Sequence, residues 1–138
     1  MTIAGRLLRR FRRSERGSVS AEAVLWFGGM VLVSAFMVDA TTIFHTQSTV
    51  LRVMQDGNRN LSIGRLVTAA ETESYIEARL AAISTRAQAT STINASGDIV
   101  TTSVRLPVAD AQLIGLFGSL NGMEITVSSK HLIENWGA

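Results

Sequence analysis

The residues whose types and spacing could do chemistry lie close to the N-terminus. Gly17 and Ser18 form a small-residue junction, and Glu22 follows it after a short interval. A peptidase needs an accessible backbone, which a glycine before the cut supplies. Cleavage between Gly17 and Ser18 would release an α-amine that is charged at neutral pH, because its pKa is about 7.7–8.0. The carboxylate of Glu22, the fifth residue of the shortened chain, would be an available partner for that amine.

The surroundings of Glu22 explain why its carboxylate needs a partner. Residues 23–38 carry no charge and are mostly apolar. An ionised carboxylate in apolar membrane surroundings is costly when it is unpaired, so acids at such positions usually have a partner. The Ser18 amine could come from the same chain or from a neighbouring copy. In the second arrangement, the Ser18–Glu22 pair would fix the axial register of two parallel helices during assembly.

The charge distribution separates residues 1–17 from the rest of the chain. The 138 residues include 13 Lys and Arg and 11 Asp and Glu, for a net charge of +2. Without residues 1–17, seven basic and ten acidic residues remain, for a net charge of −3. A nucleic-acid-binding domain needs a basic patch on a folded surface. We therefore interpret residues 1–17 as a basic leader and expect no nucleic-acid partner. The arginines before the junction are Arg6, Arg9, Arg10, Arg12, Arg13 and Arg16.

The apolar segment predicts a membrane span within a long helix over residues 18–64, with the membrane part at about 19–44. Its uncharged core, Ala23–Val38, covers about 24 Å at roughly 1.5 Å per residue, which is less than a hydrocarbon layer of about 30 Å. Glu22 and Asp39 are therefore expected near the two interfaces, and His45 is interpreted as a second polar residue at the exit. The basic leader places the N-terminus in the cytoplasm and the residues after Asp39 outside.

Small residues recur at intervals of seven along this segment. Such residues allow the backbones of two membrane helices to approach closely, and interfaces between membrane helices are enriched in them. The repeat therefore predicts a helix-packing seam for contact with another subunit. Its members are Ala21, Gly28, Ala35 and Thr42.

Beyond the membrane part, the helix is expected to become amphipathic and to end near Gly64. An apolar stripe continues through Ile43, Val50, Met54 and Leu61. Thr68 and Glu71 have the spacing of a capping box, which predicts the start of a second helix that runs through Ile83.

The remaining residues predict a small sheet. Two strands, Thr90–Ala95 and Ile99–Leu106, are joined by a glycine-containing turn at residues 96–98. A short helix is expected over Ala109–Phe117, and a third strand over Met123–Leu132. The predicted fold is α+β: a long N-terminal transmembrane and amphipathic helix, a second helix and a small three-stranded antiparallel sheet. Residues 65–138 would form the extracytoplasmic head.

The composition argues against several classes of chemistry. The chain has no cysteine, which excludes disulfides and thiolate catalysis. His131 has no companion ligands at the spacing of a zinc site. No nucleophile elbow or catalytic pair of acids is present. We therefore expect no enzyme activity, no catalytic residue, no metal, no cofactor and no small-molecule substrate.

The stretch from Ser14 to Glu22, followed by the apolar run, resembles the prepilin processing site of type IV pilin-like proteins. The fuller pattern, with a weaker similarity over residues 39–65, resembles the TadE-like minor pseudopilins of tight-adherence (Tad/Flp) pili. The resemblance implies cleavage by a prepilin peptidase after Gly17 and a role in assembly for Glu22. It also implies three kinds of partner, namely the peptidase, the Tad inner-membrane platform and other pilins or pseudopilins. The expected location is the bacterial inner membrane, with a periplasmic head, or the extracellular pilus.

Two other interpretations of the N-terminal region stay open on the sequence. In the first, an ordinary signal sequence is cut after Ala40, which leaves a periplasmic or secreted binding domain that starts near Thr41. In the second, the chain stays uncut and serves as a single-pass envelope scaffold. The first residue of the mature protein distinguishes these interpretations from cleavage between Gly17 and Ser18.

Overall fold

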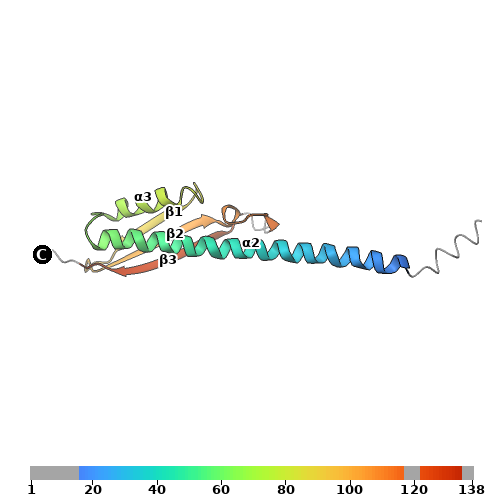
Figure 1. The fold of residues 1–138 in the computed structure, drawn as a ribbon. Helices are drawn as coiled ribbons and strands as arrows, with labels where there is room; N and C mark the ends of the chain where they lie inside the picture. The colour runs from blue at the N-terminus through green and yellow to red at the C-terminus, as the bar shows by residue number, and fades with distance from the viewer. Residues whose placement is uncertain (1–15, 117–121, 135–138) are drawn as a thin grey trace, which may run out of the picture. The chain divides into compact units, whose positions relative to one another are not determined.

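The computed structural model describes residues 16–116 and 122–134, with side chains from residue 21 onward. Its elements are α2 (Arg16–Ser62), α3 (Ala69–Leu80), β1 (Gln88–Ile93), β2 (Ile99–Pro107), the 3-10 helix η1 (Val108–Asp110) and β3 (Glu124–Leu132) (Figure 1). The predicted α+β fold is confirmed. Of the described residues, those from Arg16 to Met37 belong to one unit and those from Val38 onward to a second, which we call the head. The predicted leader lies outside the described residues except at its last two positions.

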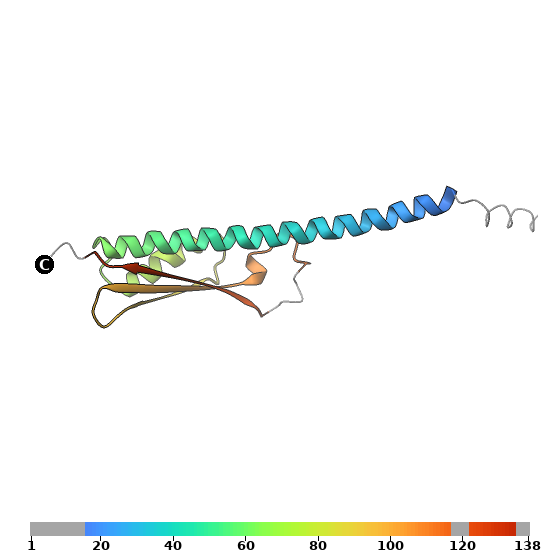
Figure 2. The same cartoon turned by 90° about the horizontal axis from the view of Figure 1, so that it is seen from below.

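The head has two layers, with helices on one face of an antiparallel sheet in the order β1-β2-β3 (Figure 2). Alternate residues of β2 are buried beneath the helices, as expected for a strand with one covered face. The core joins Val50 and Met54 of α2 to Ile76 and Leu80 of α3 and to residues of all three strands. The predicted apolar stripe of α2 is therefore the face that covers the sheet.

The ends of the helices follow the local sequence signals. α2 stops at Ser62, just before Gly64, whose φ of 75° reverses the chain in a conformation that glycine adopts easily. At the start of α3, the Thr68 hydroxyl accepts a hydrogen bond from the Glu71 amide at 3.1 Å. The Glu71 carboxylate in turn accepts one from the Val67 amide at 2.8 Å. The predicted capping signal is confirmed, although α3 ends at Leu80 and Ile83 packs on the core from the following turn.

The hairpin between β1 and β2 is confirmed, but its first strand lies two residues earlier than predicted. Asn94 belongs to the turn because its side-chain oxygen accepts hydrogen bonds from the Asp98 and Ile99 amides, both at 3.0 Å. Asparagine is common where a strand ends in a turn, because its side-chain oxygen can accept hydrogen bonds from nearby backbone amides. The strand therefore ends at Ile93.

The helix predicted over Ala109–Phe117 is wrong. The chain forms the single turn of η1 and then an irregular stretch through Gly115; Leu116 is in 3-10 conformation, and Phe117 lies outside the described residues. Two features prevent a helix in this segment. Gly115 has a φ of 83°, and the amides of Leu113, Ile114 and Leu116 are bound by a carboxylate of α2 instead of by helical carbonyls.

The two edge strands of the sheet, β1 and β3, have different surroundings. Along β1, the Glu77 carboxylate accepts a hydrogen bond from the Ala89 amide at 2.9 Å, and Glu73 accepts one from the Ser91 amide at 2.6 Å. These carboxylates of α3 occupy backbone donors that another strand would need for pairing. On the β3 side, a shallow hollow lies between α2 and the strand, lined by Gln47, Ser48, Leu51, Thr126, Val127 and Ser128.

A close approach of α2 to α3 depends on Gly57. A Cβ atom at this position would lie 2.8 Å from Cγ1 of Ile76, a side chain that is fully buried. We expect Gly57→Ala to lower the free energy of unfolding by about 1–3 kcal/mol, because overpacking outweighs the helix propensity of alanine. Thermal unfolding of the detergent-solubilised chain, followed by circular dichroism, measures this effect.

Gly29→Ala is the matched control, since nothing lies within 4 Å of a Cβ at that helical glycine. It should leave the stability of the head unchanged. Ile76→Ala removes the clashing atoms, so the double variant Gly57→Ala/Ile76→Ala should be less destabilised than the sum of the two single changes. Strict additivity would contradict a steric origin.

Candidate functional site

The apolar part of α2 is fully available to an outside partner. Among the described residues, one stretch of helix, Ala21–Ser62, is long and apolar enough to cross a membrane, and its most apolar 18-residue window has a mean hydropathy of 1.8. No residue of that window is buried, whereas the core helix of a soluble domain would be covered. The exposed large side chains of this segment include Val24, Leu25, Trp26, Phe27, Met30 and Leu32. Such a surface is compatible with lipid as its environment.

The predicted cleavage site lies at the start of this helix. Gly17 and Ser18 belong to the first turn of α2, and Glu22 follows one turn later with an exposed side chain. Ser18 and Glu22 are four residues apart on one helix. An amine released at Ser18 would therefore lie about one helical turn from the Glu22 carboxylate. The charge pair itself requires the cut, so it stays a prediction.

The predicted packing seam has two different environments. Ala21 and Gly28 are exposed, and nothing lies within 4 Å of a Cβ built on Gly28. Ala35 and Thr42 are half-buried, and the Thr42 hydroxyl donates a hydrogen bond to the Val38 carbonyl at 2.9 Å. The N-terminal half of the seam is therefore the part that is open to another helix.

Asp39 forms the most elaborate polar site at the end of the apolar segment. Its side chain is fully buried, with 0% of its surface exposed. Oδ1 accepts hydrogen bonds from the amides of Leu113 at 3.1 Å and Ile114 at 2.7 Å, and Oδ2 accepts one from Leu116 at 2.8 Å. Three backbone donors thus surround one carboxylate, and such charge-assisted bonds are among the stronger hydrogen bonds in proteins.

Sequence reasoning placed Asp39 at an interface but missed this role. The sequence contained one usable signal: an acid follows sixteen uncharged residues, and an acid in that position usually has a partner. The partner itself could not be inferred, because the three amides lie more than seventy residues further along the chain. His45, by contrast, has an exposed side chain, and its expected place at the exit from the membrane stays a prediction.

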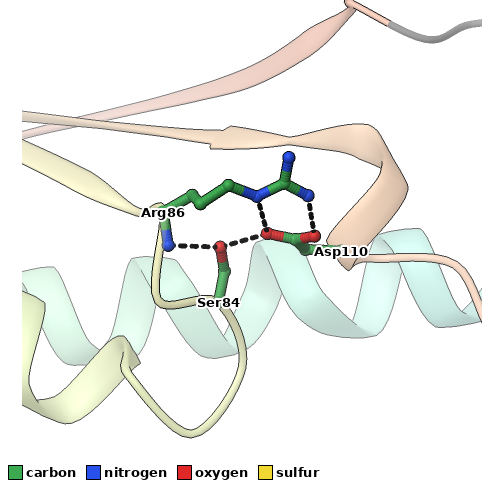
Figure 3. A network of polar contacts seen from close by, with 3 residues as sticks. All are labelled: Ser84, Arg86 and Asp110. Carbon is green, nitrogen blue, oxygen red and sulfur yellow. Dashed lines mark hydrogen bonds and ion pairs between the residues drawn. The ribbon is translucent and has the colours of Figure 1, made fainter.

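A second polar cluster holds η1 against the turn that leads into β1 (Figure 3). Arg86 makes a two-pronged contact with the Asp110 carboxylate, through Nε at 3.2 Å and through Nη2. Ser84 donates its hydroxyl hydrogen to Asp110 and accepts a hydrogen bond from the Arg86 amide at 3.1 Å. The arginine neutralises the carboxylate, which makes Asp110 a poor base for activating the serine. The role of this cluster is therefore structural, and we call Ser84, Arg86 and Asp110 the clasp.

This clasp predicts a pH dependence of stability. Hydrogen bonds from Arg86 and Ser84 lower the pKa of Asp110 below its ordinary value of 3.8. Because the folded pKa is depressed, the contribution is fully present above the unfolded pKa and is lost as pH falls through the folded one. Asp110→Asn should therefore be less stable than the unmodified chain at pH 7, and the difference should shrink below about pH 3, which lies under the ordinary pKa of an aspartate. Urea unfolding at the two pH values tests this, and a constant difference would contradict it.

A buried polar chain links the C-terminal part of α2 to the sheet. Thr102 donates a hydrogen bond to Asn58 Oδ1 at 2.6 Å and also contacts the Ser91 hydroxyl at 2.9 Å. All three side chains are buried, and Asn58 Nδ2 has no hydrogen-bond partner among the described residues. Polar groups inside an apolar core favour one alignment of the layers, since any other alignment leaves them unpaired. This chain therefore helps to fix the position of α2 along β2.

The described part of the chain contains no group of three or more His, Cys, Asp or Glu side chains that could hold a metal ion. The described residues include an exposed apolar helix segment, the predicted Gly17–Ser18 junction, and a polar site within the head where Asp39 binds the loop at residues 113–116. No protein-family model, curated protein or solved structure matches this chain.

Proposed function

We propose that this chain is a minor pilin-like subunit that takes part in the assembly of a Tad/Flp adhesion pilus after a prepilin peptidase cuts it between Gly17 and Ser18. The observation that carries the proposal is the position of the junction. It lies before an exposed apolar helix segment, so cleavage removes the basic leader and keeps the anchor on the mature protein. A conventional secretory signal is cut after its apolar stretch.

The environment of Asp39 supports this interpretation over a signal sequence cut after Ala40. A chain that started at Thr41 would lose Asp39, and the amides of Leu113, Ile114 and Leu116 would lose their acceptor. Unpaired backbone donors cost about 1–3 kcal/mol each when they are buried. The hydrogen bonds of this loop therefore depend on a residue that such a cut would remove.

The proposed partners follow from the same arrangement. The peptidase acts on Gly17 and Ser18, and the platform and other pilins contact the anchor through Glu22 and the open half of the seam. The proposed location is the bacterial inner membrane, with the N-terminus cytoplasmic and the head periplasmic, followed by incorporation into the extracellular filament.

Mass spectrometry of the N-terminal peptide from membranes and from sheared filaments tests the proposal. A mature chain that begins at Ser18 is the expected result. A start at Thr41 would identify a secreted domain, and a start at Met1 in both fractions would identify an uncut scaffold. The variant Gly17→Leu is expected to accumulate with its leader attached, while Gly28→Ala should be processed normally.

A further inference from the structure

The loop at Gln112–Leu116 exposes an unusual concentration of apolar side chains. Leu113 is 73% exposed, Ile114 53% and Leu116 44%. No charged residue occurs in this stretch. Met123 lies at the same end of the sheet, since its carbonyl accepts a hydrogen bond from the Val108 amide at 3.0 Å, and its side chain is also exposed. A neighbouring group of large apolar side chains on a small head indicates an interaction surface.

The backbone of the loop is prepared for an environment that has little water. Three of its amides donate to the Asp39 carboxylate, so the loop presents apolar side chains while these donors are satisfied inside the head. Irregular backbone enters lipid only when its polar groups have internal partners. The arrangement removes much of the free-energy cost of transferring the polar backbone of a loop from water to lipid.

The residue that holds this loop lies at a defined place in the sequence. Asp39 is the residue that directly follows the uncharged stretch 23–38, and it holds the loop through direct hydrogen bonds. A bilayer that accepts the uncharged stretch must have its surface close to Asp39. The loop amides that Asp39 binds are therefore expected near that surface.

We propose that Leu113, Ile114 and Leu116 insert into the interfacial region of the same bilayer that holds the apolar segment of α2. The occupant of this surface is lipid, at the boundary between headgroups and acyl chains, where apolar side chains of peripheral elements are buried by about 5–10 Å. The inference rests on the proposed membrane anchoring of the chain. It adds a second membrane contact, which holds the head against the bilayer until the subunit is extracted.

The absence of cysteine makes a depth measurement straightforward, because each introduced thiol is unique. Three single-cysteine variants of the full chain, Ile114→Cys, Leu32→Cys and Ala95→Cys, replace exposed side chains and are labelled with an environment-sensitive fluorophore. The labelled chains are reconstituted into phosphatidylcholine vesicles that carry nitroxide quenchers either at the headgroup or in the middle of the acyl chain. Ala95 is the matched control, since it lies in the hairpin turn at the opposite end of β2.

The expected result is that the label at position 114 is quenched mainly by headgroup nitroxide and the label at position 32 mainly by acyl-chain nitroxide. The label at position 95 should be quenched by neither. A label at position 114 that behaves like the one at position 95 would overturn the loop proposal and leave the anchor intact. Loss of quenching at position 32 would instead overturn the anchor itself. If the label at position 114 is shielded from water only at a high protein-to-lipid ratio, the loop contacts a second copy of the chain. That result would also overturn the lipid proposal.

Discussion

Glu22→Ala should leave cleavage after Gly17 intact and reduce incorporation of the subunit into filaments by at least about tenfold. A carboxylate in apolar surroundings is costly when unpaired, and pairing with the Ser18 amine would remove much of that cost. Each 1.4 kcal/mol of lost pairing corresponds to about a factor of ten in the assembly equilibrium. In the proposed function the peptidase would contact the junction, whereas assembly would depend on the charge of Glu22. Immunoblots of sheared filaments and of membranes, together with the N-terminal mass, measure the two effects separately.

The controls separate charge from shape. Glu22→Gln keeps the size of the side chain and removes its charge, so it should fail in assembly almost as severely as the alanine variant. Glu124→Ala removes an exposed acid from β3 and should assemble normally. Normal incorporation of both Glu22 variants would exclude charge pairing as the basis of assembly, even if the mature chain begins at Ser18.

The elements that could be predicted from the sequence are those whose signals are local. The burial of Val50 and Met54 follows from helical periodicity, and the start of α3 follows from the spacing of Thr68 and Glu71. The hairpin follows from the turn residues around Gly97, whose φ is 77°. In each case the signal itself, a periodicity, a capping pair or a turn, spans only a short stretch of the chain, so the pattern contains the information that fixes the element.

The features that could not be predicted depend on contacts between distant segments. The segment after Asp110 has enough apolar residues to suggest a helix, but its amides are bound by Asp39 instead. The closeness of Gly57 to Ile76 likewise depends on the packing of two helices, and a helical glycine alone does not reveal it. Of the candidate site, the junction and the acid at Glu22 stay predictions from the sequence, while the hydrogen bonds between Asp39 and the loop emerge only from the three-dimensional arrangement.

Asp39→Ala should produce a large loss of stability in the head. The substitution leaves three backbone donors without their acceptor, each at a cost of about 1–3 kcal/mol if it stays buried. A decrease of about 3 kcal/mol or more in the free energy of unfolding is therefore expected, on that same scale of cost. Urea unfolding in detergent micelles measures it. His45→Ala, at an exposed position on the same helix, is the control and should have little effect.

Asp39→Asn tests the geometry of the site in finer detail. An asparagine that keeps its oxygen toward Leu113 and Ile114 must direct its amide nitrogen at the Leu116 amide, where two donors then face each other. Its stability should lie between those of the unmodified chain and Asp39→Ala. Hydrogen exchange resolves where the loss falls, because faster exchange should be concentrated at residues 113, 114 and 116 while β2 stays protected. Equal stability of all three proteins would show that these hydrogen bonds do not hold the loop, and the membrane contact inferred from it would then lose its support.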